Sequence, residues 1–183
     1  MELKIVQMAI PEECNLILAQ SHFIKTVEDV YDALSSSAAG IKFGLAFSEA
    51  SGECLVRHDG NDEGLRKAAS ENSLKLGCGH SLVILLKDAY PINVLNQLKS
   101  VPELCRIIAA TANPLQVVVA ESEQGRGILG VIDGSGPIGI EDEAGIKWRK
   151  DLIKKLFQVF PETIHWNLAI GLDDEFLFLV PVQ

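Results

Sequence analysis

Hydrophobic and polar positions along the chain alternate in blocks that predict strands and helices in turn. Short apolar or alternating runs are typical of strands, whereas an apolar residue at every third or fourth position is typical of a helix with one buried face. Strands are predicted within 3–10, 15–20, 41–50, 53–58, 105–122 (two, around a turn) and 126–133. Helices are predicted from Thr26, within 62–77 and within 142–160, and residues 80–102 contain a strand, a polar break and a helix that begins near Pro91.

Two stretches of the chain repeat the same order of elements. Residues 16–34 match 82–101, and residues 42–56 match 106–120, in the order strand, helix, strand, strand. The offset of about 65 residues is longer than the period of solenoid repeats and indicates a duplication of two units. We therefore predict a layered α/β (α+β) domain with a mixed β-sheet, built from internally duplicated β-α-β-β-α units. This domain is expected to span residues 1–160, with residues 161–183 as a C-terminal extension packed on it.

Composition and charge narrow the class of protein. The chain has 183 residues, of which 48% are apolar and 22% charged, enough for one folded domain with a core. The net charge of −9 argues against a surface for nucleic acid or anionic membrane. No apolar run approaches the ~20 residues that span a bilayer, and the charged, strand-like N-terminus does not resemble a signal peptide. The 4 cysteines lack metal-like spacing, so we expect reduced thiols in a cytoplasmic protein.

The junction between the strand at 15–20 and the helix at Thr26 is the first candidate site. A helix start presents free backbone N–H groups and the positive end of its dipole, which together attract phosphate. Ser21, Lys25 and Thr26 would add further donors around it. His22, just upstream, could act as a general base or carry a phosphoryl group. The alternative is that His22 is only a hydrogen-bonded residue at the end of a strand.

Two further histidines occur next to turn signals. His58 is followed by Asp59 and a Gly-Asn turn that leads into a helix, and the alternative interpretation is a solvated turn. His80 follows Gly77 and Gly79, which allow close backbone approach. Because Gly77 also fits a plain helix C-cap, His80 could be no more than the first residue of a strand.

The glycine-rich segment 121–139 contains two formal G-x-G-x-x-G matches, but neither has the setting of a dinucleotide site. The first continues into a strand, and the second carries Pro137 and reaches its helix late. Arg126, between Gly125 and Gly127, is nevertheless suited to hold an anion near bare backbone. No P-loop, protein-kinase or G-x-S-x-G motif is present, so phosphoryl chemistry would need an unusual scaffold.

Several longer segments together resemble the adenosine-specific kinase family. They are QSHFIKTVEDVYDAL (20–34), GIKFGLAFSEASG (40–52), LVRHDGND (55–62), PINVLNQLKSVPELCRI (91–107), ATANPLQVVVAE (110–121) and EQGRGILGVIDG (123–134). The resemblance runs from Met1 to about Gly139 and continues weakly through the helix that ends near Phe160. The last segment of the chain, from Phe160 onward, is not part of it.

The resemblance implies an α/β domain that assembles into a homo-oligomer, with a trimer as the first expectation. It also implies clefts that bind adenosine or its phosphates (ATP, ADP or AMP) and a histidine that carries a phosphoryl group. By position, that histidine is His22, His58 or His80. We favour His22, because a phosphate on its ring would lie beside Lys25 and the helix start. His58 is the runner-up, with Asp59 available to fix its tautomer.

The leading hypothesis is therefore a phosphotransferase that acts on adenosine or an adenine nucleotide. Lys25 and Arg126 would hold phosphate, and Asn113 would position the substrate. Glu49 or Asp133 would orient the nucleophile or bind magnesium, since a carboxylate with phosphates suits that ion, although both could equally be solvated strand ends. The rivals are a non-catalytic adenine-nucleotide sensor or regulatory oligomer and, last, a purely structural oligomer.

Overall fold

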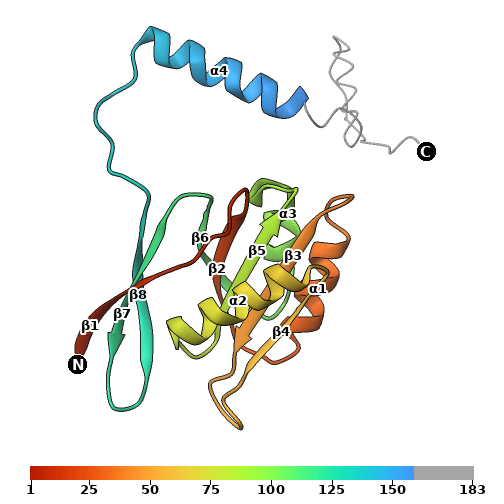
Figure 1. Cartoon of the computed structure of the whole chain (residues 1–183), viewed down its shortest axis with the longest axis vertical. Coiled ribbons are helices and arrows are strands. Elements are labelled where there is room, and N and C mark those ends of the chain that lie inside the picture. The colour runs from red at the N-terminus through yellow and green to blue at the C-terminus, as the bar shows by residue number, and fades with distance from the viewer. Residues whose placement is uncertain (159–183) are drawn as a thin grey trace, which may run out of the picture. The chain divides into compact units, whose positions relative to one another are not determined.

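The computed structural model describes residues 1–158, which contain four helices and eight strands (Figure 1). The strands are β1 (Glu2–Gln7), β2 (Asn15–Ser21), β3 (Lys42–Ser48), β4 (Val56–Gly60), β5 (Ser81–Lys87), β6 (Leu104–Thr111), β7 (Leu115–Glu121) and β8 (Arg126–Asp133). The helices are α1 (Thr26–Ser35), α2 (Glu63–Leu76), α3 (Pro91–Lys99) and α4 (Glu143–Gln158). Each strand and helix that the sequence pattern predicts has its counterpart among these elements.

The chain divides into two units between Ser135 and Gly136, and the first unit contains two antiparallel sheets. One sheet has five strands in the order β4-β3-β5-β2-β6, and the other has three in the order β1-β7-β8. The layered α/β (α+β) domain is thus confirmed, but its sheets are antiparallel rather than mixed. The helical crossover from β2 to β3 does make these strands parallel, but β5 pairs between them, so parallel strands are never neighbours.

The duplicated units interleave in the five-stranded sheet. β2 and β5 pair at the centre, β3 lies beyond β5, and β6 lies beyond β2, so the two strand-helix-strand halves occupy equivalent places. The fourth strands differ, because β4 pairs with β3 whereas β7 leaves to join the second sheet. The duplicated pattern therefore holds for β2, β3, β5 and β6 and does not hold for β4 and β7.

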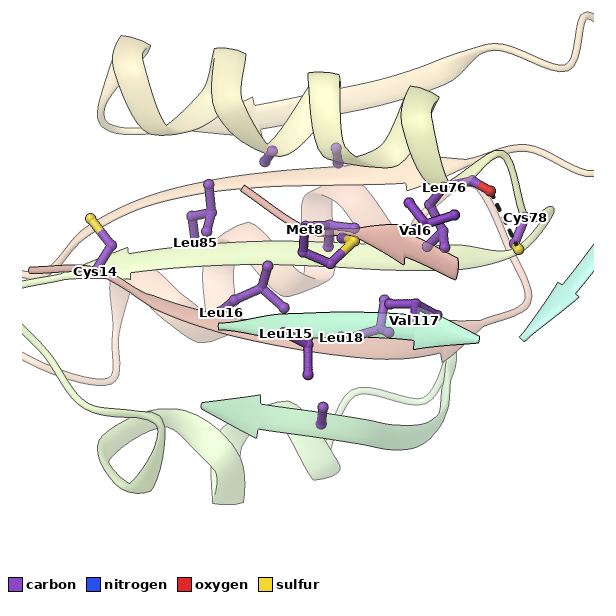
Figure 2. Close-up of a cluster of buried hydrophobic side chains, with 14 of the residues drawn as sticks. Val6, Met8, Cys14, Leu16, Leu18, Leu76, Cys78, Leu85, Leu115 and Val117 are labelled. Atoms are coloured by element: carbon purple, nitrogen blue, oxygen red, sulfur yellow. Dashed lines mark hydrogen bonds between the residues drawn. The ribbon is translucent and has the colours of Figure 1, made fainter. Parts of the chain in front are cut away.

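The five-stranded sheet is covered on both faces, and alternate residues of its strands enter different cores. On one face, Ile17 and Ile84 pack with the apolar residues of α1 and α3. On the other face, Leu16 and Leu85 pack with α2 and with Val117 of the second sheet (Figure 2). Strands buried on both faces explain the continuous apolar runs in the sequence.

Helix α2 is fixed at both ends and lies unusually close to the sheet. The Asp62 carboxylate accepts the N–H of Leu65 at 2.9 Å as an N-cap, and Gly77 ends the helix with a φ of +65°. A Cβ on Gly44 of β3 would lie 2.1 Å from the backbone nitrogen of Arg66. Glycine at this position therefore allows the backbones of β3 and α2 to touch.

The second unit begins at Gly136, and its described part contains α4. The Asp142 carboxylate accepts the N–H of Gly145 at 2.8 Å at the start of this helix. The predicted extension 161–183 lies outside the described residues, and the boundary at residue 160 stays a prediction. Within residues 1–158, no helix combines the length and the apolar character that crossing a membrane requires.

Candidate functional site

Ser21 is the corner residue at which β2, β5 and β6 come together. Its backbone N–H donates to the carbonyl of His80 at 2.9 Å, and its hydroxyl donates to the carbonyl of Glu103 at 2.8 Å. The hydroxyls of Ser21 and Thr26 lie 2.6 Å apart, and both residues are fully buried. These two hydroxyls, predicted as donors for phosphate, are thus engaged inside the protein and hold the start of α1 against the sheet.

The start of α1 is closed by a tight turn. The N–H groups of Thr26 and Val27 donate to the carbonyls of Phe23 and Ile24, at 3.0 and 3.3 Å. The exposed ammonium of Lys25 pairs with Asp29 at 2.7 Å, and this hydrogen bond raises the pKa of Lys25. Of the donors predicted at this helix start, several therefore already have protein acceptors.

The three candidate histidines lie in different places. His22 is exposed, its backbone N–H donates to the backbone carbonyl of Glu103 at 3.2 Å, and its ring stacks on Phe23. His80 lies opposite Ser21, is half-buried, and has its ring stacked on Phe47 with 5.9 Å between centroids. His58 is exposed on β4, which is the edge strand beyond β3, and lies opposite Ala46. The structure thus brings His22 and His80 to one corner and leaves His58 elsewhere.

His80 also has a backbone conformation that is rare for a residue with a side chain. Its φ is +59°, and its N–H donates to the carbonyl of Ser48 at 2.7 Å. Such conformations cost roughly 1–3 kcal/mol and are common at functional sites, where the surrounding structure enforces them.

A cavity of about 270 Å³ opens beside this corner, on the sheet face that also carries α2. Gln20 of β2 lines it together with its two cross-strand partners, Ser81 of β5 and Arg106 of β6. Arg126 and Gly127 of β8 form another part of the lining. His22 follows Gln20 by two positions and His80 directly precedes Ser81, so both histidines are close in sequence to lining residues, although neither lines the cavity itself.

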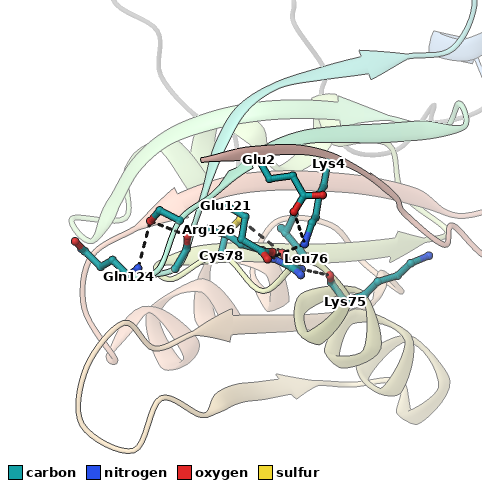
Figure 3. A network of polar contacts seen from close by, with 10 residues as sticks. Glu2, Lys4, Lys75, Leu76, Cys78, Glu121, Gln124 and Arg126 are labelled. Atoms are coloured by element: carbon teal, nitrogen blue, oxygen red, sulfur yellow. Dashed lines mark hydrogen bonds and ion pairs between the residues drawn. The ribbon is translucent and has the colours of Figure 1, made fainter.

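Arg126 is held in place by a polar network (Figure 3). Its Nε donates to the carboxylate of Glu121, which also pairs with Lys4 at 2.7 Å. Its Nη1 donates to the carbonyls of Lys75 and Leu76 at 3.3 and 3.4 Å, at the end of α2. Lys4 first and Arg126 second hold the pKa of Glu121 below its usual value. The guanidinium of Arg126 is therefore fixed before any ligand arrives.

Arg106 contrasts with Arg126. It is exposed, and its guanidinium has no hydrogen-bond or ion-pair partner among residues 1–158. A fixed arginine and an unpaired arginine on one cavity form an arrangement suited to an anion, because guanidinium groups bind phosphate and carboxylate through several N–H groups. Ile108 and Ile128, which pack against the hydrophobic core, supply an apolar wall.

Cys78 also lines the cavity and is almost completely buried. Burial raises the pKa of its thiol, and the charge of Arg126 acts in the opposite direction. The thiol donates to the carbonyl of Leu76 at 3.6 Å. Cys78 thus contributes an uncharged thiol to the wall of the cavity.

Asn113 and Asp133 lie at the other end of the sheet. The Asp133 carboxylate accepts the hydroxyl of Thr111 at 2.7 Å and the side-chain amide of Asn113 at 3.1 Å. Thr111 pairs with Leu16 near the start of β2, whereas Ser21 is at its end, a separation of roughly 15–17 Å along the strand. The structure therefore does not bring these two predicted residues together with His22.

Glu49 and Gly125 shape turns. The Glu49 carboxylate accepts Nε of Arg57 and the N–H of Leu55, both at 2.9 Å, and Arg57 lowers the pKa of Glu49. This closes the loop before β4 and explains why β4 begins later than predicted. Gly125, with φ of +155°, ends the turn from β7 to β8, where its carbonyl accepts the N–H of Ser122 at 2.9 Å.

The carboxylates expected to bind magnesium are both engaged by protein donors. Within residues 1–158, no group of three or more His, Cys, Asp or Glu side chains is arranged to hold a metal ion. The side chains of Glu49 and Asp133 therefore do not fit a resident magnesium site.

The chain belongs to the adenosine-specific kinase family, whose model matches residues 6–158. It is similar to the crystal structure of the PH1918 protein from Pyrococcus horikoshii OT3, with 41% sequence identity and a TM-score of 0.82. That likeness covers 90% of this chain and 99% of the other. A comparison with curated proteins gives no match. The family supports a kinase-like function toward adenosine.

Proposed function

We propose that this protein transfers a phosphoryl group to adenosine or an adenine nucleotide, and that the phosphates bind in the cavity of Arg106 and Arg126. The observation that carries the proposal is this pair of guanidinium groups, one fixed and one unpaired, at a corner with two histidines. Arg126 and Gly127 keep the role that the sequence indicates for them. Arg106, Gln20 and Ser81 are additions that depend on strand pairing.

The size of the cavity limits which part of a nucleotide it encloses. About 270 Å³ is below the ~300–1,000 Å³ of typical ligand pockets. Phosphate or ribose-phosphate would therefore be enclosed, and the remainder of the nucleotide would extend over the rim of the cavity.

The reaction runs in two steps with His22 as the carrier. A ring nitrogen of His22 attacks the γ-phosphorus of ATP, the new N–P bond replaces the bond to the bridging oxygen, and ADP leaves. The 5′-hydroxyl oxygen of adenosine then attacks the same phosphorus, the N–P bond breaks, AMP forms, and the hydroxyl proton passes to solvent. Positive charge beside the phosphoryl group stabilises both transfers. His80, whose carbonyl accepts the backbone N–H of Ser21 at the same corner, is the first alternative carrier, and His58 is the next.

The rival function is a non-catalytic adenine-nucleotide sensor. It is favoured by the engaged donors at Ser21 and Thr26, because a stable phosphohistidine needs free donors around it. In that case the cavity would bind nucleotide and change the assembly of the protein.

We also propose that the protein is a cytoplasmic homo-oligomer, with a trimer as the expected state. The three-stranded sheet supports assembly, because large apolar side chains of its outer strands are exposed: Leu3 and Ile5 of β1 and Leu129 and Ile132 of β8. Exposed apolar side chains that gather on one element of a fold are typical of contact surfaces.

The test is to incubate the protein with γ-labelled ATP, with and without adenosine, and to follow label on protein and on AMP. Acid-labile label on the protein, lost in His22→Ala and retained in His80→Ala and His58→Ala, supports the proposed carrier. Label that disappears only in one of the other two variants identifies that histidine instead. Nucleotide binding without label on protein or on AMP overturns the kinase proposal in favour of the sensor.

A further inference from the structure

Glu103 is a buried carboxylate that lacks a hydrogen bond on one oxygen. The residue is 7% exposed, and its Oε2 has no hydrogen-bond partner among the described residues. An unpaired carboxylate oxygen away from water is costly, and buried polar groups in native proteins nearly always have partners. Such an exception calls for a donor that arrives in another state of the protein.

Glu103 lies directly against the corner of the candidate site. Its backbone carbonyl accepts both the hydroxyl of Ser21 and the backbone N–H of His22. Its charge also contributes to raising the pKa of Lys25. Further charged or titratable groups on the elements that meet here include Glu28, Asp29, Tyr31 and Asp32 of α1, His80 before β5, Lys99 of α3, and Cys105 and Arg106 of β6.

The donors near Glu103 can be compared. Lys25 is already paired with Asp29 at 2.7 Å. The ring of His22 makes no hydrogen bond within residues 1–158, and its stacking on Phe23 has a centroid distance of 6.4 Å, which is a weak contact. A ring N–H without an acceptor and a carboxylate oxygen without a donor thus belong to residues whose backbones are hydrogen-bonded to each other.

We propose that Glu103 is a positioning residue for His22: its carboxylate accepts one ring N–H and so leaves the lone pair of the other ring nitrogen directed at phosphorus. The effect of this hydrogen bond on phosphoryl transfer rests on the proposed function, whereas the hydrogen bond between Glu103 and His22 does not. When the free nitrogen attacks, the N–P bond forms, the bond to the leaving oxygen breaks, and the ring retains its N–H and gains positive charge. The carboxylate stabilises this charge, as carboxylates do for other histidines that act in catalysis.

The hydrogen bond between Glu103 and His22 can be tested in the wild-type protein without an activity assay. With ¹⁵N-labelled histidine at about pH 8, NMR reports which ring nitrogen of each neutral histidine carries the proton. The His22 resonances are assigned by their loss in His22→Gln. We expect one tautomer in wild type and a mixture of both in Glu103→Ala, whereas Glu28→Gln, an exposed acidic residue of α1, leaves the spectrum unchanged. A mixture of tautomers in the wild-type protein overturns the proposal.

The effect of Glu103 on phosphoryl transfer is tested by labelling the protein with γ-labelled ATP. Glu103→Gln keeps the shape but removes the charge, and we expect the initial rate of label transfer to the protein to fall about 10- to 100-fold, the usual effect of losing an orienting partner. Nucleotide affinity should stay unchanged, because Glu103 does not line the cavity. Equal labelling rates in wild type and Glu103→Gln overturn the inference and leave the kinase proposal intact. A single His22 tautomer without any labelling supports the contact and refutes the proposed function.

Discussion

Gln20 of β2 and Arg106 of β6 are cross-strand neighbours, and both line the cavity that also contains Arg126. The register between β2 and β6 shifts directly beside this pair, between Gln20 and Ser21, as in a β-bulge. Because bulges redirect side chains and are frequent near active sites, this irregularity is part of how the cavity is built.

Removing Arg106 should weaken nucleotide binding without unfolding the protein. Arg106→Ala deletes an exposed guanidinium that has no protein partner among the described residues, so we expect ATP to bind about 10- to 100-fold more weakly, as for one or two charged hydrogen bonds. Isothermal titration calorimetry measures the affinity, and thermal unfolding checks stability. Arg66→Ala on α2 is the control of equal charge outside the cavity. Equal affinities for wild type and Arg106→Ala would show that the nucleotide binds at another place on the protein.

The elements could be predicted from the sequence because their signals are local. Asp62 and Gly77 mark the ends of α2, and Arg126, which the sequence predicts as an anion-binding residue between two glycines, lines the cavity. Arg106 could not be assigned in this way, because its place beside Gln20 depends on the register between strands far apart in sequence. Its occurrence inside the apolar strand CRIIAAT is the one local signal that could have drawn attention to it.

The grouping of Asn113 and Asp133 with His22 failed for a related reason. Assigning these residues to one site from their types and motifs takes no account of the direction in which their strands pair, and polar strand ends meet at one edge only where the strands run parallel. Because β2 and β6 run antiparallel, the end of β6 lies beside the start of β2, and Asp133 there binds Thr111 and Asn113. Direction of pairing, rather than the order of elements, decides which polar ends meet.

Gly44→Ala should destabilise the first unit strongly. The new Cβ would lie 2.1 Å from the backbone nitrogen of Arg66, and neither backbone can move without separating β3 from α2. We expect a loss of about 1–3 kcal/mol or more in the free energy of unfolding, the usual cost of overpacking. Chemical denaturation measures it. Gly130→Ala, where nothing lies within 4 Å of the new Cβ, is the control and should have little effect. Similar stability of the two variants would show that α2 is free to shift.

The ion pairs of Glu121 should make stability depend on pH. Lys4 and Arg126 lower the pKa of Glu121 in the folded protein, so its contribution is present above the ordinary pKa of about 4.3 and is lost as the pH falls through the lowered value. Glu121→Gln should therefore lower the melting temperature at pH 7 and have a smaller effect near pH 3. Thermal unfolding at both values measures this, with Glu123→Gln, in the exposed β7–β8 turn, as the control. An equal decrease at both values would assign the effect to packing instead of charge.

The apolar side chains on the outer strands of the three-stranded sheet should hold copies of the chain together. Ile5→Lys places a charge on β1 beside Leu3, and burying that charge in an interface is costly. We expect size-exclusion chromatography with light scattering to show the mass falling from a multiple of 19.9 kDa toward 19.9 kDa. Leu74→Lys changes an equally exposed leucine on α2 and should leave the mass unchanged. An unchanged multiple in Ile5→Lys would place the interface on another surface, and a wild-type protein of 19.9 kDa would refute the oligomer itself.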